Sequence, residues 1–79
     1  MSINVVFISP AYQVVEYPEL GAYELLDTRR GTGVFLQGDV ADLFRVSMEG
    51  VIANEPSEEE VDDVIGRFDA LMTQSVRYH

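Results

Sequence analysis

The chain has 79 residues, of which 14 are acidic and five are basic, so its formal net charge at pH 7 is −9. This charge argues against direct binding to DNA, RNA or an anionic membrane, because proteins hold those ligands through Lys and Arg. A chain this short is expected to form one domain over residues 1–79, since it buries only about 60% of the surface that its unfolded form exposes. Without cysteine it has neither disulfides nor thiolate metal sites, so oligomerisation is the expected reinforcement.

Residues 3–37 are rich in β-branched and aromatic residues, which cluster in short runs between Pro and Gly. The runs predict strands over about 3–9, 12–17, 22–27 and 32–37. Connections of a few residues join strands antiparallel, because parallel neighbours need crossovers of a dozen residues or more. The N-terminal half is therefore predicted to be a four-stranded antiparallel meander.

The apolar period changes after Gly38. Asp39 is a candidate N-cap, because its carboxylate can accept hydrogen bonds from the amides of a first helical turn. Apolar residues then recur at helical spacing as far as Ile52. A first amphipathic helix is predicted over about 39–53, ending before Pro56.

A second helix is predicted over about 57–74. Ser57 and Glu60 have the spacing of a capping box, and apolar residues from Val61 to Met72 fall in one stripe. The short loop between the helices makes them antiparallel neighbours, and both are expected to pack on one sheet face. The predicted fold is α+β. Whether residues 75–79 are ordered is left open.

The strands are apolar on both sides, so one sheet face is expected to lack cover from the helices. A contiguous apolar surface of this kind is typical of protein interfaces. The pattern leaves open which face the helices cover. We expect a homodimer that buries the uncovered face or pairs a free edge strand. The predicted apolar interface consists of Val6, Ile8, Val15 and Tyr17.

Carboxylates are dense from Glu55 to Asp63. They predict an acidic interaction face, which could hold a divalent cation or dock a basic partner. The favoured explanation is simpler, because the helix dipole stabilises carboxylates at a helix N-terminus. A calcium loop would also need a mid-loop glycine that is absent. The residues of this face are Glu58, Glu59, Asp62 and Asp63.

Small residues form a second strip on the same helix, which is expected on its outer side. They are Gly66, Ala70 and Thr73. Glycine inside a helix costs about 1 kcal/mol relative to alanine, so Gly66 reflects either a close contact or simple tolerance. Arg29 and Arg30 lie at an expected hairpin tip, where a solvated turn is favoured over an anion site.

The sequence offers no catalytic, cofactor-binding or metal-binding constellation. His79 is the single histidine and stands at the last position, whereas general-base catalysis needs a positioned group with a partner that orients it. The chain is therefore not expected to be an enzyme. No apolar run approaches the roughly 20 residues of a transmembrane helix, and the first residues lack a secretory signal. A cytoplasmic location is expected.

Four segments of the chain together form a pattern that is also found in other proteins: Tyr23–Asp27, Val34–Gly38, Pro56–Asp63 and Phe68–Met72. In these segments and in its closing His79, the chain resembles a family of short uncharacterised proteobacterial proteins with a domain-of-unknown-function label. The segment 3–10 departs from the family's pattern, so the resemblance does not support the register of the first strand. The resemblance implies no activity, ligand or catalytic residue.

These patterns predict a small acidic protein-interaction or regulatory module that is homodimeric and binds an unidentified protein partner. One alternative is an acidic mimic of nucleic acid that occupies a basic DNA-binding protein, which requires carboxylates at phosphate-like spacing. The second is a small-substrate enzyme, which requires a concave pocket that joins Arg29 or Arg30 with tyrosine and carboxylate groups.

Overall fold

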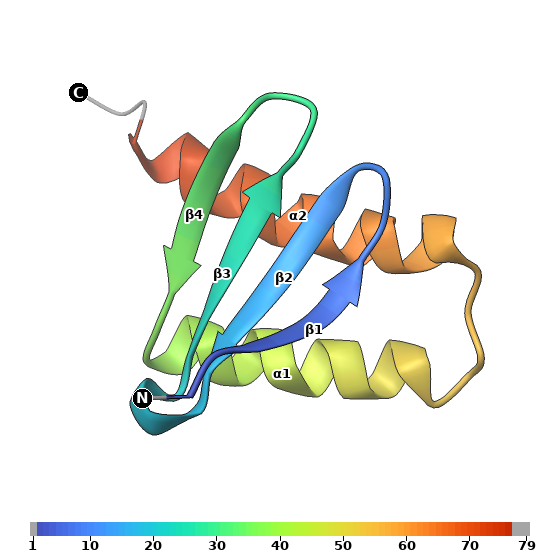
Figure 1. Ribbon diagram of the computed structural model, residues 1–79, viewed down its shortest axis with the longest axis horizontal. Helices are drawn as coiled ribbons and strands as arrows, with labels where there is room; N and C mark the ends of the chain where they lie inside the picture. The colour runs from blue at the N-terminus through green and yellow to red at the C-terminus, as the bar shows by residue number, and fades with distance from the viewer. Residues whose placement is uncertain (1, 77–79) are drawn as a thin grey trace.

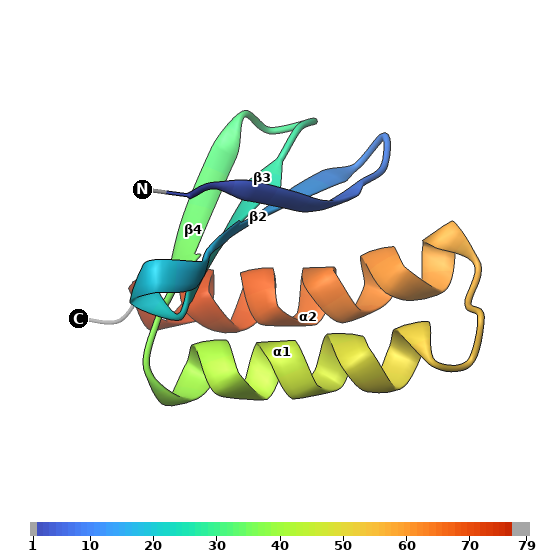
Figure 2. The same cartoon turned by 60° about the horizontal axis from the view of Figure 1, so that its bottom comes forward.

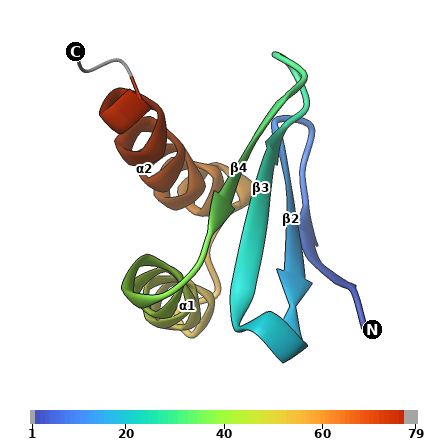
Figure 3. The ribbon, with the colours of Figure 1, turned by 90° about the vertical axis from the view of Figure 1, so that its left-hand side faces the viewer.

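The computed structural model describes residues 2–76, and it describes side chains for residues 2–72. One antiparallel sheet with the strand order β1-β2-β3-β4 is followed by two helices on one of its faces (Figure 1, Figure 3). The elements are β1 Asn4–Ile8, β2 Tyr12–Tyr17, the 3-10 turn η1 Pro18–Leu20, β3 Ala22–Asp27, β4 Thr32–Leu36, α1 Asp39–Ile52 and α2 Glu58–Val76. The predicted α+β meander with two helices is confirmed. The predictions about His79 and about the Thr73 side chain concern parts of the chain outside those that the structure describes.

The two helices run antiparallel below the sheet, as Figure 2 shows. Their buried residues meet the inner sheet face in one cluster, in which Phe44 of α1 is 1% exposed. The Phe44 ring lies 5.1 Å from the ring of Tyr23 in β3 and 5.1 Å from that of Phe68 in α2. Tilted and edge-on ring pairs of this kind add to the free energy of apolar burial. Phe44 of α1 therefore contacts both the sheet and α2.

The sequence predicts the N-cap of α2 correctly and the N-cap of α1 incorrectly. Ser57 and Glu60 form the predicted capping box, since the Ser57 amide donates to Glu60 Oε1 at 2.9 Å and the Glu60 amide donates to Ser57 Oγ at 3.3 Å. The predicted cap of α1 is wrong. Gly38 is the N-cap, with φ 69° and ψ −141°, and Asp39 is the first helical residue. Glycine adopts this backbone conformation readily, and other residues rarely do.

Strand β1 contains a bulge that the sequence pattern did not indicate. Val5 pairs with Val15 and Phe7 pairs with Val14, so Val6 is the extra residue. A bulge of one residue shifts the alternation of side chains between the two faces. Val5 and Ile8 therefore share the outer face, whereas strict alternation grouped Val6 with Ile8. Val6 therefore does not share a sheet face with Ile8, contrary to the predicted pattern.

Candidate functional site

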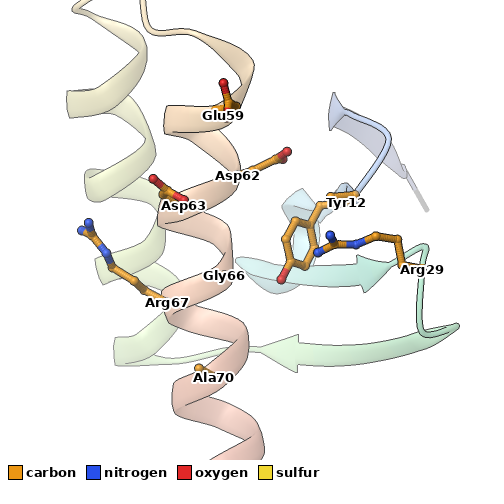
Figure 4. A pocket seen from close by; sticks show the side chains of 9 residues that line it. Tyr12, Arg29, Glu59, Asp62, Asp63, Gly66, Arg67 and Ala70 are labelled. Atoms are coloured by element: carbon orange, nitrogen blue, oxygen red, sulfur yellow. The ribbon is translucent and has the colours of Figure 1, made fainter.

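An open groove of about 650 Å³ runs between α2 and the tips of the two hairpins (Figure 4). We call it the α2 groove. Its lining residues are Ala11, Tyr12, Arg29, Glu59, Asp62, Asp63, Gly66, Arg67 and Ala70. Much of the predicted acidic face thus shares one groove with most of the small-residue strip. Glu58 is exposed and does not line it.

The phenol of Tyr12, which is 7% exposed, lines the groove. Its hydroxyl donates a 3.3 Å hydrogen bond to Oδ2 of Asp69, a carboxylate in α2 that is itself buried. Burial raises the pKa of Tyr12 above its ordinary value, and the negative charge of Asp69 raises it further. The Tyr12 hydroxyl is therefore a neutral donor that joins the sheet to α2.

Gly66 lies over this phenol and not on the outer side of α2 as expected. A Cβ atom added at Gly66 would stand 3.5 Å from the Tyr12 hydroxyl oxygen, which is an ordinary van der Waals distance. The small residue therefore faces a side chain of its own chain. Nothing in this geometry requires glycine, because an alanine methyl group would fit.

Ser9 holds Asp62, a lining residue of the groove, in place. The sequence patterns did not indicate Ser9 as a site residue. Its hydroxyl donates to Oδ1 of Asp62 at 2.7 Å and accepts from the amides of Ala11 at 3.2 Å and Tyr12 at 3.1 Å. Serine hydroxyls commonly close turns in this way. The signal in the sequence is weak, namely a serine before Pro10 between two strands. Asp62 is consequently engaged within the fold.

The Arg29 side of the groove is positioned by Asp27, which is 3% exposed. Its Oδ1 atom accepts hydrogen bonds from the amides of Arg29 at 3.0 Å and Arg30 at 3.1 Å. Such Asx turns are a known role of aspartate. The Arg30 Nε atom lies 3.6 Å from Asp27 Oδ2, while Arg29 extends over the groove opposite α2 (Figure 4). Only Arg29 of the predicted arginine pair lines the groove.

The charges of the groove are mixed. The carboxylates of Glu59, Asp62 and Asp63 lie along α2, and the guanidinium groups of Arg29 and Arg67 lie in the same lining. Within residues 2–76, no three acidic or histidine side chains are grouped closely enough to hold a metal ion. The groove therefore contains charged groups of both signs around Tyr12, whose hydroxyl is hydrogen-bonded to Asp69.

A second surface lies on the side of the sheet away from the helices. We call it the outer sheet face, and strand register assigns to it Val5, Ile8, Gln13, Val15, Tyr17, Glu24, Leu26 and Phe35. Val5, Ile8 and Phe35 are 51%, 65% and 42% exposed. Three of the four residues predicted to form the apolar interface share this face, namely Ile8, Val15 and Tyr17, although Val15 is buried.

The remaining predicted interface residue, Val6, lies elsewhere because of the bulge. With Tyr23, Phe44 and Met48 it lines a cleft of about 220 Å³ between the sheet and α1. Its side chain is 46% exposed. Val6 therefore belongs to the strand edge and the helix side, and not to the outer sheet face.

One polar pair lies on the outer sheet face. The Tyr17 hydroxyl donates to Glu24 Oε1 at 2.8 Å, and this bond raises the pKa of Tyr17. The Tyr17 ring also lies 5.7 Å from the ring of Phe35. The carboxylate of this face is thus paired, and aromatic and aliphatic groups surround it.

The architecture defines the protein as a small α+β protein with a four-stranded meander and a helical pair. Its sequence matches the family described as "Protein of unknown function (DUF3567)" over residues 3–79, and the chain belongs to this family. It is 38% identical over 85 residues to Protein BTH_I0359 of the proteobacterium Burkholderia thailandensis, an alignment that covers 98% of this chain and 100% of the relative. The resemblance stated from the sequence is confirmed. No solved structure matches the chain significantly.

Neither helix, within the residues that the structure describes, is long and apolar enough to cross a membrane.

Proposed function

We propose that the protein is a small cytoplasmic protein-interaction module that acts as a homodimer. Its two copies join through the apolar, charge-poor surface that strand β1 shares with the outer sheet face. The observation that carries this proposal is the exposure of Val5 and Ile8, which lie on β1 at the edge of the outer sheet face. Clustered apolar side chains in contact with water favour association, because burying them releases free energy.

The distribution of charge supports a second copy as the partner. Two chains that each carry a net charge of −9 repel one another, so they can associate closely only where carboxylates are scarce. Among the residues assigned to the outer sheet face, Glu24 is the one carboxylate, and it is paired with the Tyr17 hydroxyl. The dense carboxylates of α2 lie in the helical layer, on the other side of the sheet.

The two alternatives have less support. Mimicry of nucleic acid needs an unbroken row of carboxylates, whereas the α2 groove also contains Arg29 and Arg67, and its Asp62 is bonded to Ser9. The groove does bring an arginine, a tyrosine and carboxylates together, as a small-substrate enzyme would require. The Tyr12 hydroxyl, however, is committed to Asp69, and we propose a non-enzymatic role.

Sedimentation velocity at micromolar concentration tests the proposal. We expect the wild-type protein to have twice the 8.9 kDa mass of the chain. Ile8→Asp, on the outer sheet face, should give a monomer. The matched control is Leu43→Asp, because Leu43 is similarly exposed at 57% but lies on α1. It should leave the dimer intact. A monomeric wild type, or a dimer that only Leu43→Asp dissociates, would overturn the proposal.

A further inference from the structure

We infer that the two copies associate through their β1 strands, which pair edge to edge and antiparallel to make one continuous sheet of four strands from each copy. This inference rests on the proposed homodimer and assigns its geometry. The first observation is the position of β1. In the sheet that the described residues form, β1 pairs with β2 alone and occupies an edge. An edge strand presents backbone amides and carbonyls that can pair with another strand.

The edge at β1 has little protection against such pairing. Edge strands commonly avoid association by means of lysine, proline or short length, but Asn4–Ile8 contains no charged residue and no proline. Val5, Val6 and Ile8 are each at least 46% exposed. The protective feature present is the bulge at Val6. It confines a new ladder to the few residues on either side, and it does not remove the apolar side chains.

The opposite edge is better protected. Strand β4 follows the charged turn of Arg29 and Arg30, contacts α2, and is separated from α1 by two residues. Its last residue, Leu36, is fully buried in the core. A second copy would have to approach β4 beside helices that carry many of the carboxylates. The two edges of the sheet are therefore not equivalent, and β1 is the more accessible.

The occupant is a second copy because the surroundings of β1 can tolerate one. Carboxylates at both ends of the strand are bonded to their own chain. Glu19 Oε1 accepts from the Ser2 amide at 2.8 Å, and Glu16 Oε1 accepts from Asn4 Nδ2 at 3.4 Å. Beyond the other end, Asp62 accepts from Ser9. Asn4–Ile8 itself carries no charge for a charged peptide to pair with, whereas an identical strand matches its exposed Val and Ile side chains.

Antiparallel pairing of β1 with its copy also satisfies the symmetry of a dimer. A two-fold axis brings each residue of the strand opposite its partner residue in both copies, so one patch serves both chains. The unpaired backbone groups of both edges are satisfied together. The two outer sheet faces then lie side by side, and Phe35 stays exposed for a further protein to contact.

Disulfide trapping distinguishes this arrangement from stacking of the two outer sheet faces. The chain has no cysteine, so each introduced cysteine is a unique reporter. Single variants Asn4→Cys, Val5→Cys, Val6→Cys and Ile8→Cys sample the strand, and Phe35→Cys samples the outer sheet face. A disulfide needs Cα atoms about 4.4–6.8 Å apart. We expect oxidation to cross-link at least one β1 variant near the two-fold axis and to leave Phe35→Cys monomeric on denaturing gels.

A second measurement needs no substitution. Hydrogen exchange of the β1 amides should slow as protein concentration rises, because pairing gives the outward-facing amides new acceptors. Stacked faces would leave those amides exchanging at the same rate. Cross-linking of Phe35→Cys alone, with concentration-independent exchange in β1, would overturn edge pairing while the homodimer stands. A wild type that sediments as a monomer would instead overturn the proposed function itself.

Discussion

The hydroxyl of Ser9 donates a 2.7 Å hydrogen bond to Oδ1 of Asp62, a residue 53 positions further along the chain. Ser9 lies between β1 and β2, and Asp62 lies in the second turn of α2. The bond fastens the first hairpin to the second helix at one end of the α2 groove. A carboxylate that sequence reasoning placed on an interaction face therefore has a role within the fold.

Replacing Ser9 with alanine should destabilise the protein. Ser9→Ala removes the donor to Asp62 and the acceptor for two turn amides, at a position that is 6% exposed. Loss of buried hydrogen bonds of this kind costs about 1–3 kcal/mol in the free energy of unfolding, which urea denaturation measures. The control is Asp63→Asn, an exposed neighbour, which should change that free energy by less than about 0.5 kcal/mol. Equal stability of Ser9→Ala and wild type would contradict this prediction.

The sequence predicts what depends on local spacing. The capping box of Ser57 and Glu60 spans three residues, and the apolar period of each helix repeats within a turn, so both are visible without the fold. The bond from Ser9 to Asp62 arises only when a hairpin packs on a helix far along the chain. No periodic pattern encodes it. Candidate sites are harder to predict than elements for this reason.

Two details of the fold were predicted incorrectly from the sequence, and both differences have a physical cause. The bulge at Val6 has no glycine or proline beside it, so the sequence alone predicts strict alternation of side chains in this strand. At the start of α1, Asp39 is a residue type that commonly caps helices. Gly38, however, adopts a backbone conformation that makes it the N-cap, one residue earlier. In β1, one residue of displacement changes which side chains share a face. The acidic face and the small-residue strip likewise converge because α2 turns both toward the hairpin tips.

Gly66→Ala should stabilise the protein. Alanine favours helix over glycine by about 0.8–1.0 kcal/mol, and the added methyl group would meet the Tyr12 hydroxyl at an ordinary contact distance of 3.5 Å. We expect a gain of up to about 1 kcal/mol in the free energy of unfolding, measured with urea. Gly50→Ala in α1 is the matched control, because nothing lies within 4 Å of its Cβ position. It should give a similar gain.

Gly38→Ala serves as the opposite control, since its φ of +69° makes any side chain costly, by about 1–3 kcal/mol. If Gly66→Ala lost stability while Gly50→Ala gained it, the space above Tyr12 would have to be smaller than the structure indicates.

Tyr12 should make stability depend on alkaline pH. Burial and the charge of Asp69 raise its pKa in the folded state above the ordinary 10.0. The folded protein thus retains a proton that the unfolded chain releases, so the free energy of unfolding is highest below about pH 10 and falls as the pH rises through and beyond that value. The Tyr12 phenolate would also lie beside the Asp69 carboxylate. Urea denaturation from about pH 9 to about pH 11 should therefore show falling stability.

Tyr12→Phe isolates this contribution. Phenylalanine cannot titrate, so the decline with pH should be shallower in the variant than in wild type, although Tyr17 and Tyr23 retain shifts of the same sign. At neutral pH the variant should be less stable by about 1 kcal/mol, because Asp69 loses the donated hydrogen bond. Tyr17→Phe should cost less at neutral pH, since its hydroxyl pairs with Glu24 on the outer sheet face. Parallel pH curves for wild type and Tyr12→Phe would show that Tyr12 titrates as it does in the unfolded chain, contrary to its buried position beneath Gly66.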